Sequence, residues 1–213
     1  MPTRIYVLAG VNGAGKSSIG GAAMQAHGAA YFNPDLTARM LQDSSPGLTL
    51  EQANALAWEQ GRRGLERALH EGLNFAFETT LGGNTISNML LDGAHAGAEV
   101  HVWYAGLSSP ELNIERVRAR VQAGGHDIPE TKIRARFNSS RANLIKLLPY
   151  LASLRVYDNS EEADPKAGQA PRPVLLLHWE NRRIVAHVPL DQVPEWAKPI
   201  MAHAFACVGR PPA

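Results

Sequence analysis

Hydrophobic positions follow two different periods along the first 160 residues. Short apolar runs that are typical of buried strands lie at 5–9, 30–32, 73–77, 99–105 and 154–157. Between these runs, apolar residues recur at helical spacing, most clearly at 51–70, 85–96 and 110–121 and in a stretch that starts with a predicted capping box at 127–130. Strands that alternate with helices predict an α/β fold, with a parallel sheet covered by helices on both faces.

The pattern changes after residue 160. Residues 161–173 form a polar stretch with proline and glycine, which we interpret as a linker. Two apolar runs at 174–179 and 183–188 flank a short polar turn, a spacing that predicts a C-terminal β-hairpin. We therefore expect a core at 1–160 with a helical lid at about 110–150, followed by a hairpin and helix at 174–213 that pack on the core.

A glycine-rich stretch follows the first predicted strand. Residues 10–17, GVNGAGKS, match the pattern G-x-x-x-x-G-K-[ST] of the P-loop. Glycines let such a loop turn its amide N–H groups toward a phosphate, the lysine then bridges the β- and γ-phosphates, and the serine hydroxyl binds Mg²⁺. We expect ATP and Mg²⁺ as cofactors. The predicted ATP-binding residues are Gly10, Asn12, Gly13, Ala14, Gly15, Lys16, Ser17 and Ser18.

Acidic and polar residues follow the second and third strands, where ligands bind in parallel sheets. Asp35 fits a catalytic base that takes the proton of an acceptor hydroxyl, and equally an aspartate that caps a helix. Glu78 fits an acid that orients Mg²⁺ or contacts substrate, or a carboxylate held by nearby backbone amides. Asn33, Thr79 and Thr80 are further candidates for substrate binding, although the threonines also suit a turn.

Arginines gather on the two helices of the predicted lid. Arg116 and Arg120 are four residues apart and share one helix face, and a Gly-Gly-His turn at 124–126 leads to the next helix. Such arginines neutralise charge on a transferred phosphoryl group, or form a solvated basic face. The predicted catalytic arginines are Arg120 and Arg136.

Composition and charge exclude several kinds of partner and site. The formal net charge is +1, and the basic residues lack the aromatic interleaving of a nucleic-acid binder, so we expect no nucleic-acid partner. No apolar run approaches 18 residues, and the first strand follows the N-terminus so closely that it leaves no room for a signal peptide. We expect a cytoplasmic protein. The single cysteine, Cys207, excludes an intrachain disulfide, and the eight histidines show no metal-ligand spacing.

The motif alone leaves several classes of P-loop protein open. Neither the N-K-x-D stretch of a GTPase nor the L-S-G-G-Q run of a transporter ATPase is present, which favours a small-molecule kinase. Two alternatives are a nucleotide-gated module that phosphorylates no acceptor and a kinase of polynucleotide 5′-hydroxyl groups.

The ordered set of motifs resembles the zeta-toxin-like P-loop kinases. The resemblance covers about 3–160 and rests on the P-loop, on 32–35 (FNPD), 77–81 (FETTL), 116–121, 124–129 (GGHDIP), Ile133, 136–137 and 156–160 (VYDNS). It implies transfer of the γ-phosphoryl group of ATP to a small hydroxyl-bearing acceptor, such as UDP-N-acetylglucosamine. It further implies that Asp35 is the catalytic base, that Glu78 lies near substrate and metal, and that an antitoxin is a potential partner. The chain is shorter than the toxins with defined substrates, and its 174–188 hairpin has no counterpart that we can place.

Overall fold

A seven-stranded, mostly parallel sheet forms the centre of the molecule. The computed structural model describes residues 1–16, 19–20, 30–125, 127–161 and 172–210. Within these residues the strand order is β2-β3-β1-β4-β5-β6-β7. The parallel strands are β1 (Arg4–Gly10), β2 (Ala30–Phe32), β3 (Phe75–Thr79), β4 (Glu99–Gly106) and β5 (Ser153–Asp158).

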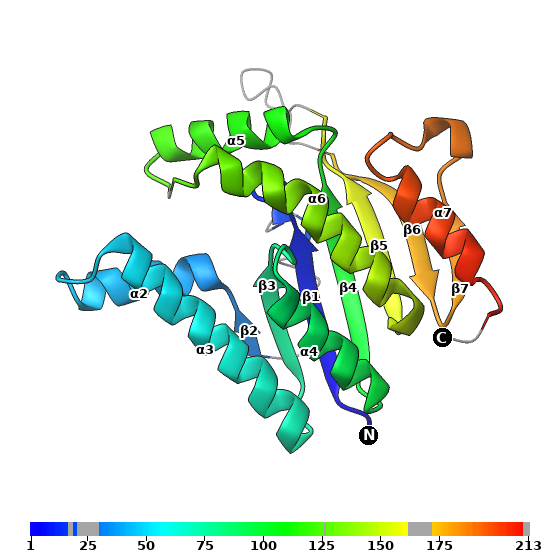
Figure 1. Cartoon of the computed structure of the whole chain (residues 1–213), viewed down its shortest axis with the longest axis horizontal. Helices are drawn as coiled ribbons and strands as arrows, with labels where there is room; N and C mark the ends of the chain where they lie inside the picture. The colour runs from blue at the N-terminus through cyan, green and yellow to red at the C-terminus, as the bar shows by residue number, and fades with distance from the viewer. Residues whose placement is uncertain (17–18, 21–29, 126, 162–171, 211–213) are drawn as a thin grey trace.

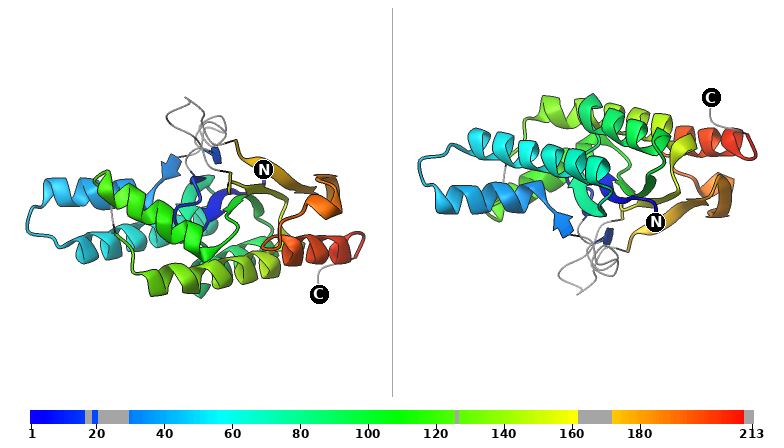
Figure 2. Two further views of the ribbon diagram at one scale, coloured as in Figure 1. Left: turned by 90° about the horizontal axis from the view of Figure 1, so that it is seen from above. Right: turned by 90° about the horizontal axis from the view of Figure 1, so that it is seen from below.

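Among the described residues, a layer of helices covers one face of this sheet, and the prediction for the other face falls largely on residues outside the described ones. One face carries α3 (Leu50–Glu71), α4 (Asn84–His95), α6 (Glu130–Leu147) and α7 (Lys198–Cys207) (Figures 1 and 2). These helices bury Leu65, Leu90, Leu144 and Ile200 in one core with the strands. On the opposite face, Gly20 of the helix after the P-loop lies against Leu8, since a Cβ on Gly20 would be 2.5 Å from the Leu8 side chain.

Helix ends follow local signals in some places and tertiary contacts in others. A capping box between Thr49 and Gln52 begins α3, and Gly72 ends it with a left-handed φ of 72°. The capping box predicted at 127–130 is wrong. Pro129 is the N-cap of α6 and makes no side-chain cap bond, while the carboxylate of Asp127 accepts the N–H of its neighbour Ile128.

The predicted C-terminal hairpin is confirmed. Strands β6 (Val174–Glu180) and β7 (Arg183–His187) continue the sheet in antiparallel pairing beyond β5. Asn181 and Arg182 have φ values of 48° and 62°, the positive pair that a two-residue hairpin turn requires. The helix α7 then returns to contact α6.

Two helical pairs frame the carboxyl ends of the parallel strands. The pair α2 (Pro34–Ser44) and α3 extends from the β2 edge, and α5 (Pro110–Gln122) lies with the start of α6 above the strand ends (Figure 1). This arrangement brings the segments after β1, β2, β3 and β5 together at one edge of the sheet. None of the described helices is long and apolar enough to cross a membrane.

Candidate active site

The glycines of the P-loop have conformations that other residues rarely adopt. Gly13 and Gly15 have φ values of 75° and 68°, in the left-handed region. Gly10 ends β1 beside β4, and a Cβ on it would lie 2.1 Å from the carbonyl oxygen of Ala105. The loop therefore has the turned shape that glycines at these positions allow.

Two buried asparagine side chains hold the loop from outside. The side-chain amide of Asn113, on α5, donates to the carbonyl of Asn12. The amide of Asn159, after β5, donates to the carbonyl of Ala14 at 2.9 Å. Neither asparagine is more than 2% exposed. These two bonds fix the carbonyls of Asn12 and Ala14 on the protein side of the loop.

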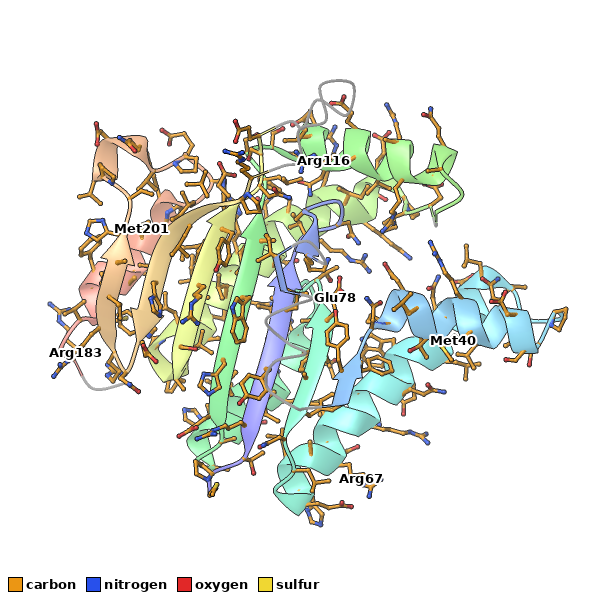
Figure 3. The ribbon with its side chains drawn as sticks, turned by 180° about the vertical axis from the view of Figure 1, so that it is seen from behind. Met40, Arg67, Glu78, Arg116, Arg183 and Met201 are labelled. Carbon is orange, nitrogen blue, oxygen red and sulfur yellow. The ribbon has the colours of Figure 1, made fainter. Side chains whose placement is uncertain are left out.

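The P-loop lysine pairs with the acid at the end of β3. Lys16 Nζ lies 3.5 Å from Glu78 Oε1, and each side chain is 11% exposed. Glu78 Oε2 accepts hydrogen bonds from the Tyr31 hydroxyl at 2.8 Å and the Asn33 amide at 2.9 Å. Burial, together with the charge of Glu78, raises the pKa of Tyr31, so this hydroxyl remains a donor. Figure 3 shows Glu78 at this edge of the sheet, with Arg116 on α5 above it.

Asp35 begins α2 next to this network. Its backbone N–H donates to the side-chain oxygen of Asn33 at 2.9 Å, so the side chain that caps α2 belongs to Asn33. The Asp35 carboxylate lies 3.5 Å from Arg120 Nη1 and is 60% exposed. Bonds thus run from the backbone N–H of Asp35 through Asn33 and Glu78 to Lys16, while the Asp35 carboxylate pairs with Arg120.

Of the six arginines on α5 and α6, the five other than Arg118 differ in the groups they contact. Arg136 donates to the Asn12 side chain of the P-loop at 3.1 Å; burial lowers its pKa, and the charge of Asp35 partly offsets this. Arg120 faces Asp35. The other three make contacts away from these groups: Arg116 donates to backbone carbonyls after β5, Arg134 pairs with Glu111, and Arg141 donates to the carbonyls of Phe137 and Trp196.

Thr79, the last residue of β3, and Thr80 after it stabilise the turn that follows the strand. The hydroxyl of Thr79 accepts the N–H of Leu81, and that of Thr80 accepts the N–H of Gly82. Ser140 of α6 donates to the Thr80 carbonyl at 2.7 Å. This support holds Leu81, a buried residue with a φ of 54°, in a conformation unusual for leucine.

Part of the predicted site cannot be placed. Ser17 and Ser18 lie outside the described residues, and so does His126. Within the described part of the chain, no three His, Cys, Asp or Glu residues lie close enough together to hold a metal ion. Two hollows, of about 590 and 410 Å³, lie between α5 and α6 and are lined by residues such as Ile114, Arg118 and Glu130 rather than by the P-loop.

The family follows from a comparison with models of known families. The model described as "Zeta toxin" matches residues 2–164, which is most of the chain. The chain belongs to the zeta toxin family. The resemblance found in the motifs is thereby confirmed, and the match ends before β6, so β6, β7 and α7 lie beyond it.

Individual relatives of this zeta toxin family member are distant. An uncharacterized protein of Haemophilus influenzae is 27% identical over 142 residues, 64% of this chain and 94% of that protein. The solved AvrRxo1-ORF1:AvrRxo1-ORF2 complex with sulphate ions has a chain with a TM-score of 0.60 and 17% identity; the match covers 96% of this chain and 64% of that one. The PezAT toxin–antitoxin structure of Streptococcus pneumoniae has a TM-score of 0.55 and 14% identity, covering 99% and 88%. At these identities the structures show the shared fold.

Of three residues that support the site, Tyr31 and Asn113 were not predicted, whereas Asn159 was. Tyr31 was counted only as part of an apolar run, and Asn113 gave no signal beyond its place beside the apolar stripe of α5. Asn159 lies in the short segment after β5 where strand-end reasoning expects functional residues. Each of the three acts through a contact with a residue more than 40 positions away.

Proposed function

We propose that this chain is an ATP-dependent kinase that phosphorylates a hydroxyl group of a small metabolite. A sugar nucleotide such as UDP-N-acetylglucosamine is the first acceptor to test. The observation that carries the proposal is the network that joins the start of α2 to the P-loop lysine: the backbone N–H of Asp35 donates to Asn33, the Asn33 amide donates to Glu78, and Glu78 pairs with Lys16. An AvrRxo1-ORF1:-ORF2 structure with ATP, at a TM-score of 0.61 and 16% identity, supports the choice of nucleotide.

The residues fit the parts of a phosphoryl-transfer site. When bound, ATP with Mg²⁺ supplies the phosphoryl group. Lys16 directs its charge toward the phosphate oxygens, and the Ser17 hydroxyl and Glu78 are the candidate ligands and organisers of the metal shell. Asp35, exposed to solvent, takes the proton of the acceptor hydroxyl. Arg120 and Arg136 neutralise the charge that moves between nucleotide and acceptor.

A screen with radiolabelled ATP tests the proposal. Sugar nucleotides and other hydroxyl-bearing metabolites are incubated with γ-labelled ATP and Mg²⁺, and labelled products are separated. We expect Asp35→Asn to lower transfer by about 10²–10⁴-fold while ATP still binds. Lys16→Ala should weaken both transfer and ATP binding. Asp43→Asn, the same change at an exposed position on the same helix, should leave both unchanged.

The outcome separates a kinase from a nucleotide-gated module. A chain that binds ATP but labels no acceptor supports the module, and Asp35→Asn turnover equal to wild type removes the base assignment. We also propose an antitoxin as partner, since the PezAT structure is that of a toxin–antitoxin system. Growth arrest on expression of the wild type, absent with Asp35→Asn, tests whether toxicity depends on the proposed chemistry.

A further inference from the structure

Trp196, in the segment between β7 and α7, contacts the ends of two central strands. Its side chain is buried, and its indole Nε1 donates to Asp158 Oδ1 at the end of β5, at 3.2 Å. Its ring lies directly on Gly106, the last residue of β4, where a Cβ would come within 2.1 to 2.6 Å of three ring atoms. A residue beyond the family match therefore contacts the edge of the sheet that carries the candidate active site.

Hydrogen bonds connect Asp158, through the turn that follows it, to the P-loop. The carboxylate oxygen that accepts the indole proton also accepts the N–H and the hydroxyl of Ser160, which fixes the turn after β5. The residue between them, Asn159, donates its backbone N–H to the Gly106 carbonyl at 3.1 Å. Its side-chain amide donates to the Ala14 carbonyl of the P-loop at 2.9 Å. The position of this amide thus depends on a turn that Trp196 helps to hold.

Both lid helices, α5 and α6, also donate hydrogen bonds to this group of residues. Arg141 of α6 donates to the Trp196 carbonyl at 3.2 Å, and α6 also carries Arg136, which binds Asn12 of the P-loop. Arg116 of α5 donates to the carbonyl of Asn159 at 2.7 Å. The segment around Trp196 therefore contacts both the turn that supports the P-loop and the helix that closes over it.

We propose that Trp196 is a positioning residue for the nucleotide site. Its indole N–H holds the Asp158 carboxylate in position, and the carboxylate holds the turn at Ser160. This turn then positions the Asn159 amide against the Ala14 carbonyl of the P-loop. The C-terminal part that follows the family match thereby contributes to ATP affinity. This inference rests on the proposed function, because it takes the P-loop of this chain to bind ATP.

Trp196→Phe tests the role of the indole N–H, because it keeps an aromatic ring against Gly106. The matched control is Trp179→Phe. Trp179 lies on β6, is fully buried, and its Nε1 has no hydrogen-bond partner among the described residues. Both variants are compared with wild type by urea unfolding and by calorimetric titration with a non-hydrolysable ATP analogue. We expect Trp196→Phe to weaken binding by about threefold to tenfold, which is the effect of losing one hydrogen bond of ordinary net strength, and Trp179→Phe to leave it unchanged.

A double-mutant cycle distinguishes positioning from a general loss of stability. Asn159→Ala removes the amide on the P-loop, so adding Trp196→Phe to it should weaken ATP binding no further, although the two losses of stability still accumulate. Asp158→Asn, which keeps an oxygen in place of the carboxylate, provides a second variant and should weaken binding in the same direction. Once an acceptor is found, KM for ATP should rise while kcat stays near that of wild type.

The results separate the two proposals. If wild type binds the analogue and Trp196→Phe and Asp158→Asn bind it equally well, the positioning role is refuted while the proposed function stands. Additive effects of Trp196→Phe and Asn159→Ala on binding also refute it. If wild type does not bind the analogue, the proposed function fails, and the positioning role fails with it.

Discussion

Replacing Glu78 by glutamine tests the charge pair at the centre of the site. The change keeps the size of the side chain and an oxygen for the Tyr31 and Asn33 donors, but it removes the negative charge opposite Lys16. At 3.5 Å the gross Coulomb attraction of this pair is about 5 kcal/mol for an effective dielectric constant of about 20. Part of that attraction offsets the cost of taking both groups out of water.

The net effect on stability follows from burial. Removal of one partner from a fully buried pair costs about 3–5 kcal/mol, because the other charge is left without compensation. Here each side chain retains 11% exposure and the two neutral donors keep an acceptor, so we expect a loss of about 2–3 kcal/mol in the free energy of unfolding. For a chain of this length the corresponding fall in Tm is about 4–12 °C. Glu66→Gln, at a pair on α3 whose acid is 61% exposed, should lose less than about 1 kcal/mol.

The same variant should respond more strongly to an anion. In wild type, a triphosphate that binds Lys16 competes with Glu78 for the ammonium group and meets the repulsion of the carboxylate. In Glu78→Gln both effects disappear, so tripolyphosphate without Mg²⁺ should raise Tm by more than it does in wild type. Thermal unfolding with and without the anion measures both quantities. A variant as stable as wild type, or one with a smaller rise in Tm, would refute this account of the pair.

Two further predictions concern the supports of the site. Gly106→Ala should cost about 1–3 kcal/mol in urea unfolding because the new methyl group overlaps the Trp196 ring, whereas Gly47→Ala, with open space around it, should cost little. Tyr31→Phe should make stability less dependent on alkaline pH. Burial and Glu78 raise the pKa of Tyr31 above 10, so the native chain keeps a proton that the unfolded chain loses. The free energy of unfolding of wild type therefore falls as the pH rises above 10. Urea unfolding curves below and above pH 10 should show a shallower fall in the variant.

The order of elements could be predicted from the sequence, because each strand is an apolar run and each helix has its own period. The ends of a strand could be predicted less well where pairing with a neighbouring strand determines them. The third strand was predicted at 73–77, where the apolar run stands, but β3 spans Phe75–Thr79. Its last residue pairs with Ala9 of β1, so the parallel ladder continues past the apolar residues. A local pattern carries no information about that partner.

In the candidate site, too, some features could be predicted from the sequence and others depend on distant partners. Strand-end reasoning selected Asp35 and Glu78 because the carboxyl ends of parallel strands converge, and the structure joins both to one network. The functions of arginines four residues apart could not be read from spacing. Arg116 and Arg120 share a helix face, yet Arg116 turns to the carbonyls after β5 while Arg120 faces Asp35. Which partner each arginine meets depends on where another strand ends.

The environments of the two carboxylates favour different roles for them. Glu78 is 11% exposed and is held by a tyrosine hydroxyl, an asparagine amide and Lys16, so its oxygens have fixed directions. Such a group can orient a lysine or the ligands of a metal, but moving it to meet a substrate would break several bonds at once. Asp35 is 60% exposed at the start of a helix capped by Asn33, and its carboxylate lies 3.5 Å from Arg120 Nη1. An acceptor hydroxyl can reach it without disturbing the cap, which is the arrangement a catalytic base needs.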